Sequence, residues 1–269
     1  MRCQECGLVR VRSHPEQSEL NALYGESYYR SRNSRHLGYT DYVADEANIR
    51  RTARRRLRQL QRHAVKGRLL DIGCATGFFL DEAQKAGWSV TGLDPSDFAV
   101  QYARNHFGLD VLHGTLENVN LPAQSFDLVT MWDVIEHVSD PAGCIRQVRR
   151  LLRDDGVLTL ATPNVESIPA RLAGRAWVGY KLSGEHVTFF SKRTLSQMLD
   201  SAGFTVLQTR HIGKHVSLAL FRNRLGMYFP LMARLLNVVE DLAGLSTLSL
   251  YVNPFDIIQV TARKGTGST

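Results

Sequence analysis

The sequence predicts an α/β protein built on a doubly wound, mostly parallel sheet of seven strands. From residue 67 onward, short apolar runs alternate with longer stretches whose apolar residues recur every three or four positions. A glycine-rich turn follows the first apolar run, and an acidic residue ends the second. Strands that are separated by helices in this way form a parallel sheet with helices on both faces.

The elements follow one another in a regular order. The expected strands are residues 68–73, 88–94, 110–114, 126–133, 157–163, 205–212 and 255–264. The expected helices are residues 77–87, 95–107, 141–156 and 191–204, the last with Ser191 as its N-cap. Ligands of such sheets bind outside the carboxyl ends of the strands, so the residues that end the first, second and fourth strands are candidate site residues.

Two segments lie outside this core, which we expect to comprise residues 65–213 and 253–264. Residues 1–64 form an N-terminal extension, and residues 214–252 are an insert rich in large apolar side chains. The insert is too long for an ordinary hairpin loop, so it must fold and pack on something. It could line an apolar pocket, form a dimer interface, contact a membrane surface, or serve as a helical cap.

The composition is that of an ordinary globular protein, with 43% hydrophobic and 22% charged residues. No apolar run is long enough for a membrane span, and the first residues lack the apolar core of a signal peptide. The cysteines at positions 3, 6, 74 and 144 are too few and too scattered for a disulfide framework. We therefore expect a cytoplasmic protein, as a monomer or a homodimer.

Much of the net charge of +7 lies in one arginine-rich stretch, residues 50–62. Apolar residues interrupt this stretch at helical spacing, which predicts an amphipathic helix with a basic outer face. Such a face could bind nucleic acid, anionic lipid headgroups or an acidic substrate. A merely solvated face is the interpretation that we favour.

The turn after the first strand has the features of a cofactor-binding loop. It reads Asp71-Ile-Gly73-Cys-Ala-Thr-Gly77, and its glycines let the backbone approach a ligand that lies at a helix N-terminus. Asp94, at the end of the second strand, can accept hydrogen bonds from both hydroxyls of a ribose. Together these features predict a nucleoside cofactor. The loop lacks the G-x-G-x-x-G pattern of dinucleotide sites and the lysine of a nucleoside triphosphate loop.

The ordered motifs resemble those of a known enzyme class. They read LLDIGCATG, VTGLDPS, FDLVTMWDVIEHVSDP, LLRDDGVLTLATPN and EHVTFFSKRTLSQMLDSAGF. As a set, they are similar to the class I S-adenosylmethionine-dependent methyltransferases, within the broad group that includes the ubiquinone-biosynthesis O-methyltransferases. The resemblance covers residues 67–211 and the last strand, and it implies a Rossmann-like fold and S-adenosylmethionine as cofactor.

The resemblance also implies roles for individual residues. Those expected around the methionine part of the cofactor are Asp71, Gly73, Ala75 and Gly77. Asp94 would hold the ribose and Pro95 would lie beside the adenine. Thr115 stands where the family often has an acid that contacts the adenine, so the backbone of Leu116 would replace that contact. Cys74 and Asp133 complete the set of cofactor candidates, with Cys74 as a small residue that faces the sheet and not a nucleophile.

Asp133, Glu136 and His137 would share one face of a helix, and His186 lies on a later loop. Ubiquinone-pathway O-methyltransferases and small-RNA 2′-O-methyltransferases are similar here, which implies a divalent metal held by these four residues. Alternatively, His137 or His186, with Glu136, acts as a general base without a metal, or the group is purely structural. Tyr39 and Tyr42 are candidates for a lid over the cofactor.

Cys3 and Cys6 have the spacing of half a zinc site, with His14 as a third candidate ligand. Zinc usually requires two such pairs, and the interpretation that we favour is a relic of a longer motif in relatives.

The expected reaction is transfer of a methyl group from S-adenosylmethionine to a hydroxyl of a small molecule, a lipid-like quinone or a glycan precursor. Methylation of carbon or nitrogen, or of RNA through the basic helix, are the alternatives within the enzyme class. A binding protein that retains the fold without catalysis is a third hypothesis, because a fold alone does not establish an activity.

Overall fold

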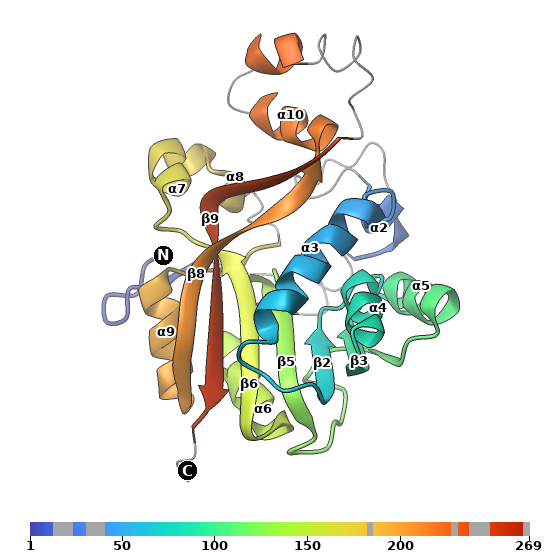
Figure 1. The fold of residues 1–269 in the computed structure, drawn as a ribbon. Helices are drawn as coiled ribbons and strands as arrows, with labels where there is room; N and C mark the ends of the chain where they lie inside the picture. The colour runs from blue at the N-terminus through green and yellow to red at the C-terminus, as the bar shows by residue number, and fades with distance from the viewer. Residues whose placement is uncertain (13–23, 31–40, 182–184, 227–230, 237–247, 266–269) are drawn as a thin grey trace.

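A computed structural model shows one central sheet with helices on both faces (Figure 1). The structure describes residues 1–12, 24–30, 41–181, 185–226, 231–236 and 248–265. Within this part of the chain, the central sheet has seven strands in the order β4-β3-β2-β5-β6-β9-β8. The predicted fold class is therefore confirmed.

The strands of the central sheet are β2 (Arg68–Ile72), β3 (Ser89–Asp94), β4 (Val111–His113), β5 (Phe126–Trp132), β6 (Leu152–Pro163), β8 (Phe204–Ser217) and β9 (Ser249–Lys264). Neighbouring strands from β4 to β6 are parallel, whereas β9 is antiparallel to both β6 and β8. Strands β3 and β4 lie on one side of β2 in the sheet, whereas β5, the next strand along the chain, lies on the other side of β2. The carboxyl ends of β2 and β5 therefore meet at the switch in strand order, where ligands of this fold bind.

Each face of the sheet has its own apolar core. One face is covered by α3 (Glu46–Leu60), α4 (Phe78–Lys85) and α5 (Asp97–Phe107), through side chains such as Leu57, Leu80 and Val100. The other face is covered by α6 (Pro141–Leu151) and α9 (Lys192–Ser201), through side chains such as Ile145 and Leu195. Ser191 caps α9 as predicted, because its hydroxyl accepts the backbone N–H of Thr194.

Helix α6 is shorter than predicted. It ends at Leu151, and Leu152 already belongs to β6, where it pairs with Phe126 of β5. Leu152 is fully buried in the core between the sheet and α6. Pairing and burial of this residue outweigh the helical spacing that favoured a continuation to residue 156.

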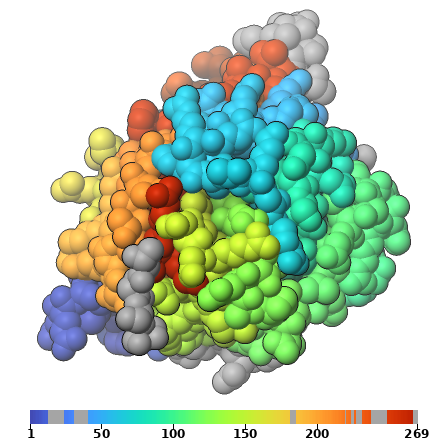
Figure 2. Space-filling model, turned by 60° about the horizontal axis from the view of Figure 1, so that its bottom comes forward, coloured from blue at the N-terminus to red at the C-terminus, as the bar shows by residue number. Residues whose placement is uncertain are grey.

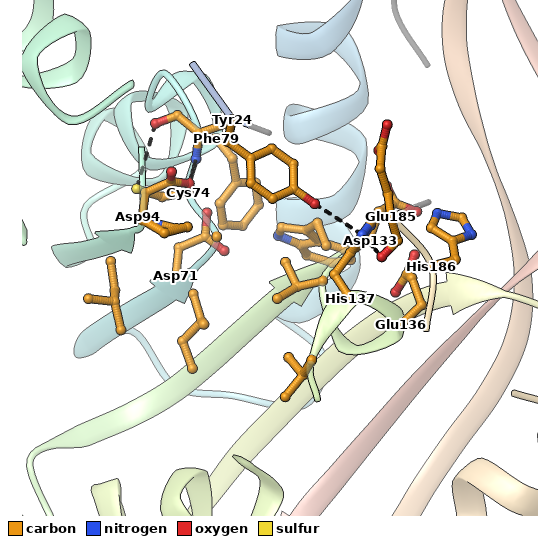
Figure 3. A pocket seen from close by; sticks show the side chains of 18 of the residues that line it. Tyr24, Asp71, Cys74, Phe79, Asp94, Asp133, Glu136, His137, Glu185 and His186 are labelled. Atoms are coloured by element: carbon orange, nitrogen blue, oxygen red, sulfur yellow. Dashed lines mark hydrogen bonds between the residues drawn. The ribbon is translucent and has the colours of Figure 1, made fainter. Parts of the chain in front are cut away.

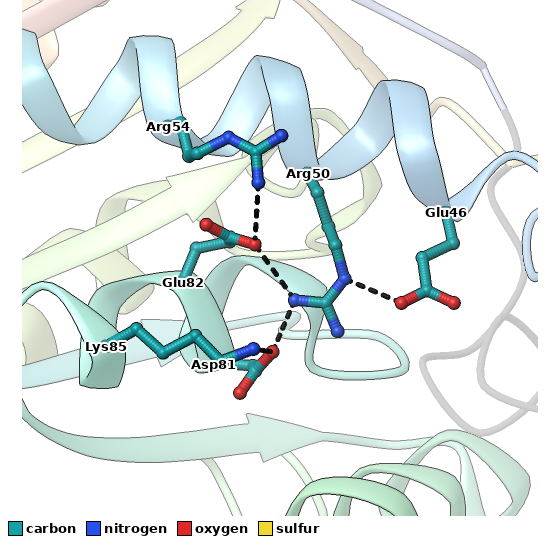
Figure 4. Close-up of polar contacts among 6 residues, drawn as sticks. All are labelled: Glu46, Arg50, Arg54, Asp81, Glu82 and Lys85. Atoms are coloured by element: carbon teal, nitrogen blue, oxygen red, sulfur yellow. Dashed lines mark hydrogen bonds and ion pairs between the residues drawn. The ribbon is translucent and has the colours of Figure 1, made fainter.

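The arginine-rich helix α3 is docked by buried ion pairs as well as by its apolar side. Arg50 donates to Glu46 and contacts both Asp81 and Glu82 of α4 (Figure 4). The Arg50 side chain is 13% exposed, and its guanidinium lies 4.9 Å from the ring centre of Phe107. The predicted basic outer face therefore comprises fewer arginines than the sequence suggested.

The other arginines of α3 divide by position. Those whose side chains are exposed are Arg51, Arg54, Arg55 and Arg58, on the face of α3 that lies open in the space-filling view (Figure 2). Arg56 is only partly exposed and points toward the end of β5, where its guanidinium lies 4.2 Å from the ring centre of Trp132.

A second, two-stranded sheet ties the N-terminal segment to the body. Strand β1 (Val9–Arg10) pairs with β7 (Thr188–Phe189), which follows the loop that carries His186. Between β6 and β7 lie α7 (Ile168–Ala173), η2 (Gly174–Ala176) and α8 (Val178–Lys181). Cys3 and Cys6 are exposed free thiols, while His14 lies outside the described residues, so the zinc hypothesis stays a prediction.

The predicted insert begins and ends inside strands. β8 continues to Ser217 and β9 begins at Ser249, so both strands extend beyond the predicted residues 205–212 and 255–264. Helix α10 (Leu218–Gly226) follows β8 at the top of Figure 1. Three apolar side chains of the described helical segment 231–236 are strongly exposed, namely Leu231, Met232 and Leu235. None of the described helices is long and apolar enough to cross a membrane.

Candidate active site

The loop between β2 and α4 adopts the conformation that its glycines predict. Gly73 and Gly77 have φ values of 70° and 84°, in the left-handed region that favours glycine. A Cβ atom at Gly73 would lie 2.4 Å from a methyl carbon of Val134, so the loop also needs glycine for close packing. Ala75 has a φ of 49°, which is a strained conformation of the kind that gathers at functional sites.

Asp94, at the end of β3, is oriented by backbone hydrogen bonds. Its two carboxylate oxygens accept the N–H groups of Ala75, at 2.8 Å, and of Ser96, at 2.9 Å. Burial raises the pKa of Asp94 to about 6, although both hydrogen bonds oppose the shift. The carboxylate is therefore fixed beside the glycine loop, where the sequence placed the ribose.

Asp71, near the end of β2, is buried and accepts a hydrogen bond of 2.6 Å from the hydroxyl of Thr130. Burial raises the pKa of Asp71 to about 7, and Thr130 and Arg56 oppose this shift. The neighbouring Cys74 is also buried, and burial raises the pKa of its thiol well above the ordinary value. A buried thiol that stays protonated is a poor nucleophile, in keeping with the packing role expected for Cys74.

A cavity of about 470 Å³ joins the cofactor candidates to the predicted acid–base residues. Such a volume is typical of small-molecule sites. The cofactor candidates that line it are Asp71, Gly73, Cys74, Ala75, Asp94, Pro95, Thr115, Leu116 and Asp133, whereas Gly77 begins α4 behind the loop. Figure 3 shows Asp71 and Asp94 at one end of this cavity, and Glu136, His137 and His186 at the other.

Glu136 and His137 lie in the short 3₁₀ helix η1 (Ile135–His137), and His186 lies just before β7. The N–H of Val187 donates to the carbonyl oxygen of Glu136 at 2.9 Å, which holds the two segments together. Possible ligand atoms of Glu136, His137 and His186 all lie within 4.8 Å of one another. The structure therefore brings together three of the four residues that the sequence grouped.

Burial shifts the pKa values of Glu136, His137 and His186. Burial, together with Asp133, raises the pKa of Glu136 to about 8. Burial lowers the pKa of His137 to about 4, and burial and His137 together lower that of His186 to about 3. Both imidazoles are therefore neutral near pH 7, and each keeps one ring nitrogen with a lone pair.

Asp133 occupies a different position from the one expected on a regular helix. It has a φ of 58°, and its carboxylate pairs with the ammonium of Lys214 at 2.7 Å. Burial raises the pKa of Asp133, but Lys214 and Arg56 outweigh this effect and bring it below the ordinary value. Asp133 is consequently not part of the group formed by Glu136, His137 and His186.

Tyrosines of the N-terminal extension cover the cavity. The hydroxyl of Tyr24 lies 3.0 Å from Nδ1 of His137, and Figure 3 shows its ring pointing toward that side chain. The carbonyl oxygen of Tyr24 accepts the hydroxyl of Ser96 at 2.5 Å, so this residue contacts both ends of the site. Tyr42 also lines the cavity and stacks on Phe78, whereas Tyr39 lies outside the described residues.

Tyr24, Arg56 and Lys214 are among the lining residues that sequence reasoning missed. Tyr24 reaches the site through contacts between distant parts of the chain, which no local pattern signals. Arg56 was counted with the outer arginines, although it lies at helical spacing from Ala53 and Leu60 of the buried side. Lys214 was assigned to the insert, but it lies on β8 and lines the cavity.

Comparison with known proteins identifies the family. The family model of a methyltransferase domain matches residues 44–209. A ubiquinone biosynthesis O-methyltransferase from Methylobacterium sp. (strain 4-46) is 31% identical over 157 residues, which cover 55% of this chain and 63% of that protein. One with the same description from Methylocella silvestris is 32% identical, over 50% of this chain and 57% of its own length. The matches thus span less than two thirds of both relatives.

A solved structure of a SAM-dependent methyltransferase from Thermotoga maritima, where SAM is S-adenosylmethionine, has the same fold. It aligns with a TM-score of 0.55 and 21% identity, over 83% of this chain and 92% of that chain. The family model covers more than half of the chain and includes the cofactor loop, Asp94 and η1. The chain therefore belongs to the methyltransferase domain family, a family of enzymes, as its motifs predicted.

Proposed function

We propose that this protein transfers a methyl group from S-adenosylmethionine to a hydroxyl of a small-molecule or lipid-like acceptor. The observation that carries the proposal is the single cavity that connects Asp71 and Asp94 with Glu136, His137 and His186. One end offers the acids and glycines suited to a nucleoside cofactor, and the other offers neutral imidazoles. The description of the relatives as ubiquinone biosynthesis O-methyltransferases supports an oxygen acceptor.

The residues of the cofactor end are suited to each part of S-adenosylmethionine. Asp94 would accept the ribose hydroxyls, since its carboxylate is already oriented by Ala75 and Ser96. Asp71 would accept the ammonium of the methionine part, and Gly73 leaves room for it. Pro95, Thr115 and Leu116 would lie along the adenine. When bound, this cofactor supplies an electrophilic methyl group on a positively charged sulfur.

At the other end, we assign His186 as the base. Its Nδ1 is buried and has no hydrogen-bond partner among the described residues, whereas Nδ1 of His137 lies near both Tyr24 and the carbonyl of Glu185. The acceptor oxygen would lose its proton to His186 as it bonds to the methyl carbon. His137 packs against His186 with their ring centres 4.7 Å apart and would hold that ring in place.

A divalent metal is a second candidate for activating the acceptor. Two histidines and a carboxylate are a recurrent ligand set, and both carboxylate oxygens of Glu136 lack hydrogen-bond partners among the described residues. Glu136, His137 and His186 would hold the metal, which would lower the pKa of the acceptor hydroxyl. Loss of activity in EDTA, restored by added Zn²⁺ or Mg²⁺, would support this candidate, and unchanged activity would exclude it.

The direct test is methyl transfer from methyl-labelled S-adenosylmethionine. Purified protein is incubated with catechol or with a bacterial extract, and the label is partitioned between organic and aqueous phases. Transfer to catechol or to an organic-phase product supports the proposal, and Asp94→Ala should abolish it. Label confined to carbon or nitrogen of the product, or to nuclease-sensitive material, would contradict the proposed hydroxyl acceptor.

A further inference from the structure

Two basic side chains, those of Lys214 and Arg56, lie together in the wall of the cavity. Nζ of Lys214 is 2.7 Å from Oδ2 of Asp133, and Nη2 of Arg56 is 4.0 Å from the same oxygen. The Lys214 side chain is 24% exposed and that of Arg56 is 12% exposed, so both charges are largely withdrawn from water. A pair of cations on one carboxylate is unusual in such a setting, because burying a charge is costly without a partner.

Hydrogen-bond donors beside these cations also lack partners. Nε and Nη2 of Arg56 and the indole N–H of Trp132 are buried and have no hydrogen-bond acceptor among the described residues. The guanidinium stacks over the indole at 4.2 Å, which fixes its plane. Buried donors are nearly always bonded in native proteins, so unbonded ones that line a cavity indicate a ligand with oxygen acceptors.

The unpartnered atoms of the cavity include acceptors and donors. Glu136 and His186 contribute acceptors, which suit the reacting hydroxyl, whereas donors come from Arg56 and Trp132 and also from Trp177. None of these donors has a use in the reaction assigned to His186. A planar guanidinium with free N–H groups matches a carboxylate, which it can bind through two parallel hydrogen bonds.

The position of Lys214 favours a carboxylate of the acceptor over the carboxylate of the cofactor. The cofactor candidates other than Asp133 lie at or just after the carboxyl ends of β2, β3 and β4, whereas Lys214 lies on β8, at the other edge of the sheet. The methionine part of the cofactor also has a carboxylate, so the two sources must be separated by experiment.

We infer that Lys214 and Arg56 form a subsite for a carboxylate of the acceptor, so that the natural acceptor is a hydroxy acid. This inference rests on the proposed function and narrows its substrate class. Asp133 is the positioning residue of the subsite, because it holds the ammonium of Lys214 beside Arg56. The acceptor would then be bound at two points, with its hydroxyl near His186 and its carboxylate near the two cations.

The test compares two aromatic diols that differ in one group, 3,4-dihydroxybenzoate and catechol. The wild-type KM should be roughly 10- to 100-fold lower for the benzoate, the range expected for hydrogen bonds to charged groups. Arg56→Met and Lys214→Met should raise the KM of the benzoate relative to that of catechol by that factor. Lys214→Arg should retain the preference, because it retains the charge.

Matched controls separate this effect from general damage. Arg58→Met and Lys66→Met remove exposed cations and should change neither KM. Because Lys214→Met leaves Asp133 without its ammonium, Lys214→Met/Asp133→Asn removes both charges and should show the same loss of preference in a stably folded protein. Thermal unfolding of every variant establishes that it is folded.

Three outcomes would overturn the inference. Equal wild-type KM values for the two diols would show that no carboxylate is recognised. A preference that survives both methionine variants would place its recognition elsewhere. Dissociation constants for S-adenosylhomocysteine that rise tenfold or more in Arg56→Met, with an unchanged preference, would assign Arg56 to the cofactor's own carboxylate.

Failure of the proposed function gives a different result. If the wild-type protein binds S-adenosylhomocysteine but methylates neither diol, calorimetry is used to measure the binding of 3,4-dihydroxybenzoate to the complex of the protein with S-adenosylhomocysteine. Binding to the wild type that is lost in Lys214→Met would support the carboxylate subsite, although the proposed methylation of these diols would be wrong. Absence of benzoate binding would overturn the subsite as well.

Discussion

Replacement of Arg50 by methionine should destabilise the fold strongly, because it breaks the ion-pair cluster between α3 and α4. Arg50 contacts Glu46, Asp81 and Glu82, and the side chains of the last two are 7% and 9% exposed. Methionine keeps most of the aliphatic length of the side chain, but it loses the contacts of the guanidinium with the rings of Phe78 and Phe107. The change therefore removes the charge and these ring contacts while it keeps a side chain of similar length.

The loss in the free energy of unfolding depends on the ion pairs that Asp81 and Glu82 keep when Arg50 is replaced. Removing one partner of a buried ion pair typically costs about 3–5 kcal/mol. Asp81 keeps Lys85 at 2.6 Å and Glu82 keeps Arg54 at 3.1 Å, but these partners are 63% and 51% exposed and only partly compensate. We expect a loss near the lower limit, about 3 kcal/mol, which corresponds to a fall in Tm of roughly 6–12 °C.

Urea unfolding followed by circular dichroism measures this loss, with Arg54→Met as the control. Arg54 makes one contact with Glu82 and is half exposed, so its replacement should cost no more than about 1 kcal/mol. Equal losses for the two variants would refute the assignment of Arg50 as the buried centre of the cluster. So would an Arg50→Met protein as stable as the wild type.

Three further predictions concern the site. Asp94→Ala should weaken binding of S-adenosylhomocysteine by roughly 100-fold or more in calorimetry, because two hydrogen bonds to a carboxylate are lost; a change below tenfold would argue against its role at the ribose. Tyr24→Phe removes the hydroxyl that lies 3.0 Å from His137 and should lower kcat by roughly 3- to 10-fold without changing that binding; an unchanged kcat would show that the contact is only structural. Glu136 has a pKa raised from 4.5 to about 8, so the folded state holds its proton more tightly than the unfolded state, and its contribution to stability is lost as pH rises through this interval. Glu136→Gln should therefore gain stability relative to the wild type between pH 5 and about pH 8 in urea unfolding, and parallel pH profiles of the two proteins would contradict the buried, raised pKa.

Local pattern was sufficient for most of the fold. Strands β2, β3 and β5, and the loop at Gly73 and Gly77, lie where apolar runs and glycines placed them. The alternation of strands and helices predicts that Asp71 and Asp94 reach the same edge of the sheet, and both line the cavity. These features depend on neighbours in sequence or on the general rules of parallel sheets.

The end of the cavity that contains Glu136, His137 and His186 depends on contacts that have no local sequence signal. His186 joined the predicted group through resemblance to relatives and not through spacing. The helical spacing of Arg56 relative to Ala53 and Leu60 places it toward the protein, but a charged residue in a run of arginines was taken for a surface residue. Lys214 lay beyond the apolar run that predicted β8, and Tyr24 reaches His137 across more than a hundred residues of sequence.

The long pairing of β8 with β9 connects the insert to the proposed carboxylate subsite, because Lys214 lies on β8. Ile212 pairs with Ile257, but Lys214 pairs with Val252, so the ladder is interrupted at Gly213, where a Cβ atom would lie 2.0 Å from the carbonyl oxygen of Val252. Beyond this interruption, successive side chains of β8 point to opposite faces of the sheet. Insertion of one residue therefore turns every following side chain to the other face. Insertion of one residue between Lys214 and Ser217 would leave Lys214 in place, whereas insertion before Lys214 would turn the lysine away from Asp133. The proposed subsite therefore tolerates variation in the length of the insert, but it does not tolerate variation at the junction of the insert with the sheet.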